Sequence, residues 1–175
     1  YNIFKPNKLL VLLLIENKII DPSKDLINII LSEKQNIPLA HRHFLYFSIK
    51  SYIDKNTQQQ IETEISNNYK IDLNTFQQNC RKGENDAKIC QLIREDNIDQ
   101  FVAYINEINY GLDSKITESL FETNDFLIEK RPSLIEYAAF FGSIQIFNYL
   151  KFHYVRITSS ILEYAIHGGN AEIIQ

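Results

Sequence analysis

Apolar residues along the first half of the chain recur every three or four positions, the spacing that gathers them on one face of an α-helix. Asp21 followed by Pro22 supplies a capping acceptor and a proline at the first helical position, and apolar residues continue from there to Leu31. Pro38 is expected to open another helix, whose apolar stripe runs toward Lys55. These patterns predict two amphipathic helices.

Further helices are expected before the middle of the chain. Residues 57–60 (Thr-Gln-Gln-Gln) have the composition of a capping box ahead of an apolar stripe. A shorter helix is expected from Leu73 to about Cys80. Together with the apolar run at residues 9–15, these segments predict an N-terminal helical bundle over residues 1–82.

A polar stretch at residues 81–86 (Arg-Lys-Gly-Glu-Asn-Asp) predicts a domain boundary, with a second domain over residues 83–175. Gly83 is suited to end one helix, and Asp86 is suited to cap the next.

Short helices are expected beyond this boundary, over residues 87–94 and 98–105. The connection from residue 109 to residue 131 has no clear helical period, and we expect strand-like or irregular structure around residues 119–128.

The most informative pattern is an internal repeat. Residues 133–139 (SLIEYAA) recur as residues 160–166 (SILEYAI), an offset of 27 residues, and Gly142 recurs as Gly169 at the same offset. Each copy begins with the Ser-x-x-Glu of a capping box and ends with a glycine suited to a left-handed helix C-cap. One helix pair alone cannot bury the apolar stripe that follows Gly142, so the pattern predicts helix pairs that stack.

The repeated unit resembles the ankyrin repeat, whose signature T-P-L-H-x-A-A-x-x-G-H-x-x-I-V is similar to residues 133–147. Leu134 replaces the proline and Glu136 the histidine, and the period of 27 residues is shorter than the usual value of about 33. Residues 87–105 look like a weaker first repeat with Asp96 at the glycine position. The resemblance implies an all-α fold in which a helical bundle precedes an ankyrin-like solenoid of helix pairs.

The stretch from Gly83 to Asn124, with the repeats after it, resembles a divergent group of ankyrin-repeat proteins from parasitic protists that carry a domain of unknown function. In that group, ankyrin arrays follow a helical region that sometimes sits behind a BTB-like dimerisation domain. The resemblance implies that residues 1–82 form a BACK-like linker and that the array is truncated at Gln175.

Composition narrows the possible partners. The formal net charge is -4 and the basic residues are scattered, so no positive field is available to hold a nucleic-acid backbone. The apolar run at residues 9–15 is far shorter than the roughly 20 residues that cross a bilayer. Cys80 and Cys90 match neither a disulfide framework nor a zinc site. We therefore expect an intracellular, cytoplasmic protein without a cofactor, a nucleic-acid partner or a membrane partner.

Candidate binding residues follow from the resemblance. It implies that the two positions after the alanine pair line a groove, which here are Phe140 and Phe141, and His167 in the next repeat. Exposed aromatic side chains of this kind dominate the energetics of interfaces, although both phenylalanines could instead pack against a neighbouring repeat. Further candidates, which could also be a solvated turn, lie on the shortened loop: Lys151, His153 and Arg156.

The sequence therefore predicts a non-enzymatic protein–protein interaction module, a scaffold or adaptor. The alternative is an architectural spacer whose N-terminal helical region self-associates. A metal-dependent hydrolase that uses His41 and His43 is a remote third reading, because no further ligand lies near this pair in the sequence. The five glycines allow no phosphate-binding loop.

Overall fold

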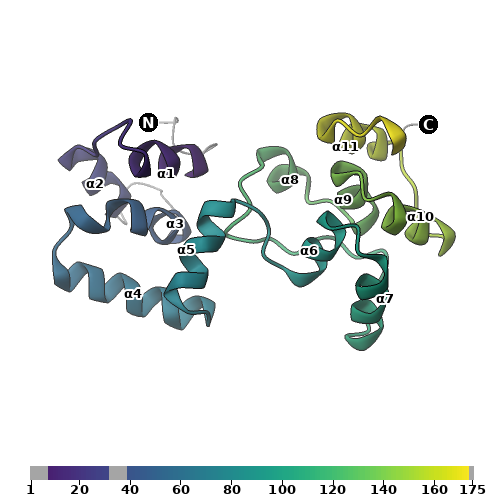
Figure 1. The fold of residues 1–175 in the computed structure, drawn as a ribbon, viewed down its shortest axis with the longest axis horizontal. Helices are drawn as coiled ribbons and strands as arrows, with labels where there is room; N and C mark the ends of the chain where they lie inside the picture. The colour runs from purple at the N-terminus through teal and green to yellow at the C-terminus, as the bar shows by residue number, and fades with distance from the viewer. Residues whose placement is uncertain (1–7, 32–38, 174–175) are drawn as a thin grey trace. The chain divides into compact units, whose positions relative to one another are not determined.

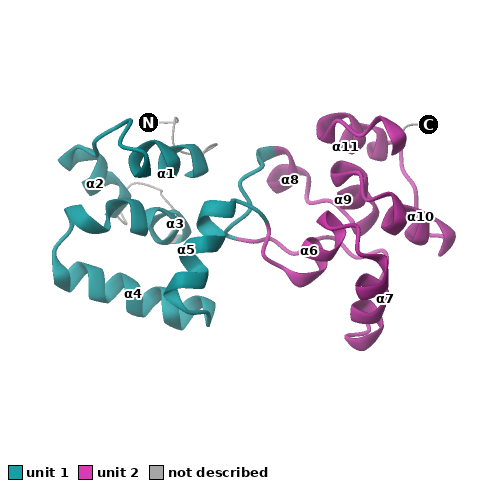
Figure 2. Ribbon diagram, in the orientation of Figure 1, with its two compact units in different colours: residues 1–84, 120–125 teal, residues 85–119, 126–175 magenta. Residues whose placement is uncertain are grey.

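The structure, a computed structural model, describes residues 8–31 and 39–173 of the chain (Figure 1). Within these two ranges the regular structure is entirely helical, and pairing of the strand type is limited to an isolated bridge between Lys115 and Ser133. The predicted all-α class is confirmed. The helices gather into two compact units, residues 1–84 with 120–125 and residues 85–119 with 126–175 (Figure 2).

The first unit contains five helices in its described part. Their bounds are α1 Lys8–Glu16, α2 Lys24–Leu31, α3 Leu39–Ile49, α4 Lys55–Tyr69 and α5 Leu73–Lys82, with a short 3-10 helix, η1, at Lys50–Tyr52. Helix α3 contacts the other four helices, so it forms the centre of the unit. Its apolar side chains are buried together with residues from every one of these helices, among them Leu12, Ile30, Phe44, Ile61 and Phe76.

The returning segment 120–125 completes this first core. Phe121 is buried there, with its ring edge-on to Phe76 at 5.1 Å between centroids. The Thr123 N–H and hydroxyl both donate to the Gly83 carbonyl oxygen, at 3.1 and 2.7 Å. Sequence periodicity does not show this return, because its signal is a single aromatic residue in an irregular stretch.

The capping residues of the first unit differ from those expected. Helix α4 begins at Lys55 rather than after Thr57, because the Asp54 carboxylate accepts from the N–H groups of Asn56 and Thr57 at 2.9 and 3.0 Å. A charged oxygen three residues before the predicted box satisfies the free N–H groups first. Gly83 ends α5 in the left-handed conformation, as predicted.

The start of α2 is also displaced. The helix begins at Lys24, and the Ser23 hydroxyl accepts from the Leu26 N–H at 3.2 Å. The Asp21 carboxylate, which was expected to cap this helix, accepts from the Tyr52 hydroxyl at 2.8 Å. The predicted helix start at Pro38 lies outside the described residues.

The second unit is built from consecutive helix pairs. Helices α6 (Lys88–Arg94) and α7 (Ile98–Glu107) form one pair, and α9 (Leu134–Phe141) and α10 (Ile144–Phe152) form the next. Helix α11 (Ser160–Gly168) is followed by a 3-10 turn, η2, at Ala171–Ile173. A left-handed residue reverses the chain inside each pair: Asp96 at φ +46°, Gly142 at +69° and Gly169 at +73°.

The pairs contact one another in chain order. Helix α9 lies between α6 and α11 and contacts both, and α7 contacts α10 (Figure 1). The apolar face of α10 is buried against this group through Ile146 and Leu150. The cluster also covers residues from α6, α7 and α11, so these helices share one hydrophobic core.

Two capping predictions after residue 84 are wrong, and a third local prediction is only partly confirmed. Asp86 does not cap α6: it accepts from the Ser119 hydroxyl, and the Asn85 side-chain oxygen accepts from the Ala87 N–H at 3.0 Å. Residues 119–124 are irregular, which was one of the two expected alternatives, whereas residues 125–128 belong to α8, Asp125–Lys130. The predicted capping box at Ser160 is absent, because that hydroxyl donates to the Glu136 carboxylate at 2.5 Å instead.

Candidate functional site

Phe140 and Phe141 are half-buried and pack within the second unit. The Phe140 ring is stacked with Phe126 at 6.2 Å between centroids and an interplanar angle of 19°. The Phe141 ring lies 4.7 Å from that of Tyr137, and the Arg94 guanidinium sits 6.0 Å from its centroid. These contacts favour the packing interpretation of the two phenylalanines over an open groove.

His167 is exposed and is joined to Phe140 through a shared neighbour. Its ring is stacked on Phe126 at 3.9 Å with an interplanar angle of 15°, and Phe126 in turn contacts Phe140. The sequence offered no reason to choose Phe126, because the short helix α8 that carries it was expected to be strand-like or irregular.

Lys151, His153 and Arg156 all lie exposed around the loop that follows α10. The His153 ring contacts the Tyr149 ring at 4.3 Å, and the Arg156 N–H donates to the Asp113 carboxylate at 3.3 Å. Val155 between them is buried, and its N–H donates to the Leu150 carbonyl oxygen at 3.2 Å. The loop is therefore anchored at its centre, while Lys151, His153 and Arg156 face solvent.

The end of α10 and the loop after it also expose large apolar side chains. Tyr154 is 95% exposed, Phe152 78% and Ile157 51%. Tyr154 also has a φ of +60°, a conformation that a bulky side chain rarely adopts. We call Lys151, Phe152, His153, Tyr154, Arg156 and Ile157 together the 151–157 surface.

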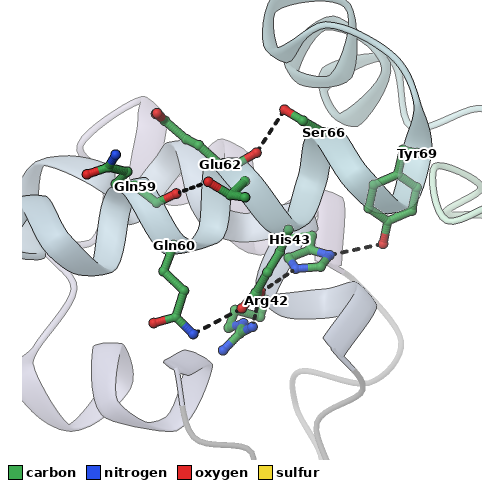
Figure 3. A network of polar contacts seen from close by, with 9 residues as sticks. Arg42, His43, Gln59, Gln60, Glu62, Ser66 and Tyr69 are labelled. Atoms are coloured by element: carbon green, nitrogen blue, oxygen red, sulfur yellow. Dashed lines mark hydrogen bonds and ion pairs between the residues drawn. The ribbon is translucent and has the colours of Figure 1, made fainter.

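A second cluster of polar side chains lies in the first unit, between α3 and α4 (Figure 3). His43 is wholly buried, with its ring nitrogens 3.1 Å from the Tyr69 hydroxyl and 3.1 Å from the Glu64 carboxylate. Arg42 is ion-paired with the same carboxylate oxygen, and the Gln60 amide donates to its other oxygen at 3.0 Å. Both ring nitrogens of His43 are therefore engaged by protein groups.

Burial sets the direction of the pKa shift of His43, whereas hydrogen bonds and charge set that of Glu64. Burial lowers the pKa of His43, although the hydrogen bond that its ring donates to Glu64 acts in the opposite direction. For Glu64, burial raises the pKa, but hydrogen bonds from His43 and Gln60 and the Arg42 charge outweigh it, and the net shift is downward. A neutral histidine with no exposed surface cannot reach a substrate, so the cluster serves to join α3 to α4.

The contacts of the neighbouring Glu62 also join helices of the first unit. The Glu62 carboxylate accepts from the Tyr46 hydroxyl at 2.7 Å and from the Lys50 ammonium at 2.6 Å. Burial and the hydrogen bond to Glu62 raise the pKa of Tyr46, so this tyrosine stays neutral. Each contact links α4 to the end of α3 or to η1.

The metal-site reading of His41 and His43 gains no support. Over residues 8–31 and 39–173, no three His, Cys, Asp or Glu side chains are grouped so that they could hold a metal ion. Cys80 and Cys90 are free and buried, and burial raises the pKa of the Cys80 thiol to about 12. A thiol of that pKa carries almost no thiolate at neutral pH, which makes it a poor nucleophile.

None of the helices that the structure describes combines the length and the apolar composition that a membrane crossing requires. Comparisons of the chain with protein-family models, with curated protein sequences and with solved structures found no match. The 151–157 surface and the helix pairs behind it are consequently the features from which function must be inferred.

Proposed function

We propose that the chain is a non-enzymatic protein–protein interaction module, in which ankyrin-like helix pairs present the 151–157 surface to a partner protein.

The interpretation of the second unit as an array of repeated helix pairs is supported by hydrogen bonds that recur at equivalent positions of successive pairs. The Ser143 hydroxyl donates to the Ile93 carbonyl oxygen at 2.5 Å. The residue 27 positions later, Asn170, donates its amide to the carbonyl oxygens of Phe140 and Ala139, at 2.5 and 3.4 Å. Two turns of the repeat thus make the same kind of contact to the preceding pair.

Exposed aromatic residues on an anchored loop are the observation that carries the binding proposal. Tyr154 and Phe152 leave most of their surface in water, which costs hydrophobic free energy that a partner would recover. Aromatic side chains also dominate interface energetics when they become buried. Three cationic or ionisable side chains surround them, Lys151, His153 and Arg156, so the expected partner segment combines apolar side chains with carboxylates.

The backbone of the loop supports the same interpretation. A positive φ at a tyrosine is costly, and such conformations persist only where the surrounding structure imposes them. Here the Tyr154 N–H donates to the Lys151 carbonyl oxygen at 3.1 Å, and buried Val155 follows immediately. The fold therefore holds Tyr154 in an outward position.

Partner capture with matched variants tests this function. The full chain, the variant Phe152→Ala/Tyr154→Ala, and the control Ile108→Ala/Ile128→Ala, whose residues are each 45% exposed, are compared by quantitative pull-down from lysate of the source cells. We expect partners that the wild type and the control retain and the loop variant loses, with all three chains equally helical by circular dichroism. Identical partner lists from all three would refute the proposed surface.

Self-association of the first unit is a second candidate, favoured by exposed leucines on α1. Leu10 and Leu13 are exposed one helical turn apart, and exposed Ile19 follows the helix. A chain with this architectural role would sediment as a dimer that Leu10→Lys/Leu13→Lys converts to monomer. A wild-type chain that is monomeric at all accessible concentrations excludes this candidate.

A further inference from the structure

The first helix of each pair in the second unit carries two apolar residues one helical turn apart. These are Ile89 and Ile93 in α6, Ile135 and Ala139 in α9, and Leu162 and Ile166 in α11. In each pair the second of the two residues lies three positions before the left-handed residue that reverses the chain. The three pairs of residues therefore occupy equivalent positions, on the same face of equivalent helices.

The burial of this face changes abruptly at the last helix. Ile89 and Ile93 are 4% and 0% exposed, and Ile135 and Ala139 are both 0% exposed. Leu162 and Ile166 are 50% and 66% exposed. Helix α6 packs against the following α9, and α9 packs against the following α11, so each of the two buried faces belongs to a helix that has a later helix beside it. Other positions of α11 are buried as in α9, notably Ile161, Tyr164 and Ala165.

We propose that the α11 face formed by Leu162 and Ile166 binds a further helix pair of the same repeat type. The proposal rests on the array described under the proposed function, and it assigns a second contact surface, separate from the 151–157 surface. The contact continues the interfaces that α9 makes with α6 and that α11 makes with α9.

The two existing interfaces define the chemistry of the occupant. Its first helix carries a small residue at the position of Ala138 and Ala165, because both are wholly buried. The backbones of α9 and α11 also approach closely at Gly168, where an added Cβ would lie 1.8 Å from the Phe140 carbonyl oxygen. Its turn carries a hydroxyl or amide donor at the position of Ser143 and Asn170, directed at the carbonyl groups around Ile166.

Charge does not oppose such an occupant. Glu163, which adjoins Leu162, is already ion-paired with Lys130 at 3.2 Å. His167, which adjoins Ile166, is stacked on Phe126. The side chains beside the apolar face are thus held by their own unit, and the face itself is left to a hydrophobic contact.

The test appends the proposed occupant to the full chain. A copy of residues 149–159 is added after Gln175 to keep the 27-residue register, and a copy of residues 133–152 after it supplies the further pair. The same extension is added to Leu162→Lys/Ile166→Lys and to the control Ile108→Lys/Ile128→Lys. Amide hydrogen exchange of α11 is followed in each, with and without the extension.

We expect the extension to slow exchange in α11 by about tenfold or more in the wild type and in the control, and to have no effect in the Leu162→Lys/Ile166→Lys chain. Equal effects in all three chains would overturn the proposal. So would an extension that stays unprotected and unfolded on the wild-type face, because the face would then not accept the pair.

Sedimentation of the unextended chain tests whether a second copy of the chain binds this face instead. A dimer that Leu162→Lys/Ile166→Lys dissociates would mean that a second copy of the chain covers this face, which contradicts the proposal; a monomer agrees with it. Failure of this inference is separable from failure of the proposed function, since partner capture depends on Phe152 and Tyr154 and the exchange measurement does not.

Discussion

At the scale of single residues, the second unit depends on side chains that cap or contact the neighbouring helix pair rather than their own. Asp96 shows this most clearly. It occupies the left-handed position that glycine fills in the later pairs, and its carboxylate accepts from the N–H groups of Gln145 and Ile146, both at 3.0 Å. The cap of α10 is therefore supplied by the turn between α6 and α7. Asp96 has an unfavourable positive φ, but its carboxylate hydrogen-bonds the next helix pair and so connects the two pairs.

We expect Asp96→Ala to lower the free energy of unfolding by about 1–2 kcal/mol, because it removes this cap and keeps a side chain at a positive φ. Asp96→Gly is expected to cost less, since glycine adopts the conformation freely. Urea unfolding of the three chains measures the difference. An Asp96→Ala chain as stable as the wild type would show that the cap contributes nothing.

Gly168 gives a steric prediction at the contact between α9 and α11. An alanine Cβ there would lie 1.8 Å from the Phe140 carbonyl oxygen, so the helices must separate. We expect Gly168→Ala to destabilise the chain by about 1–3 kcal/mol in thermal or urea unfolding. Gly111→Ala is the control, because the nearest atom to its Cβ would be the Ser114 hydroxyl at 3.0 Å. Equal effects of the two substitutions would argue against a close α9–α11 contact.

His43 gives a prediction on pH. Burial lowers its folded-state pKa below the ordinary 6.5, so the unfolded chain binds this proton more readily than the folded chain. Its contribution to stability is therefore complete above about pH 6.5 and is lost as the pH falls through the folded-state pKa. The carboxylates Glu62 and Glu64 have lowered pKa values and add their own loss only below about 4.5.

Urea unfolding at a series of pH values from about 7.5 to about 5 provides the measurement for His43, because histidines titrate in this range. We expect the free energy of unfolding of the wild type and of the exposed-residue control His153→Gln to fall over this range. His43→Gln should lose most of that slope, whatever its stability at neutral pH. A slope that His43→Gln leaves unchanged would assign the pH dependence to another group.

At the scale of elements, the sequence predicts helices well where the periodicity and the turn residue agree. The glycine turns at Gly83, Gly142 and Gly169 are left-handed as expected, and the capping box of α9 forms, with the Ser133 N–H donating to Glu136 at 2.7 Å. The expectation fails where a side chain serves a distant segment. Ser160 donates to Glu136 of the previous pair instead of capping its own helix, and no local pattern could reveal that choice.

The candidate site was predictable only in part, for the same reason. The resemblance placed Lys151, His153 and Arg156 on an exposed loop, and all three are exposed, but Lys151 belongs to the last turn of α10 and only His153 and Arg156 lie beyond the helix. The neighbouring Phe152 and Tyr154 read as ordinary apolar residues, because their exposure depends on how the loop folds over Val155. Phe140 is partly covered because α8, which periodicity did not find, brings Phe126 against it.

The equivalence of helix faces gives an element-scale prediction. Ile135→Lys places a charge at a wholly buried position of α9, so we expect a loss of about 3 kcal/mol or more, or failure to fold. Leu162→Lys changes the equivalent residue of α11, which is half exposed, and should alter stability by no more than about 0.5 kcal/mol. Urea unfolding of the two variants decides. Comparable losses would mean that the two positions are not equivalent.

At the scale of the whole chain, the two compact units each have a hydrophobic core of their own. The chain passes from the first unit to the second after Glu84, returns for residues 120–125, and enters the second unit again at Phe126. The first unit uses its polar side chains to hold α3 and α4 together. The features that suggest binding, exposed aromatic residues and an uncovered helix face, belong to the second unit, which is where we place the proposed function.

The central claim is that successive helix pairs of the second unit pack against one another in the same way. Nuclear Overhauser contacts in the isotope-labelled full chain test it most directly, at the two hydrogen-bonded turns. We predict cross-peaks between Ser143 and Ile93 and, at the equivalent positions, between Asn170 and Ala139. Helices that persist while both sets of cross-peaks are missing would contradict the claim.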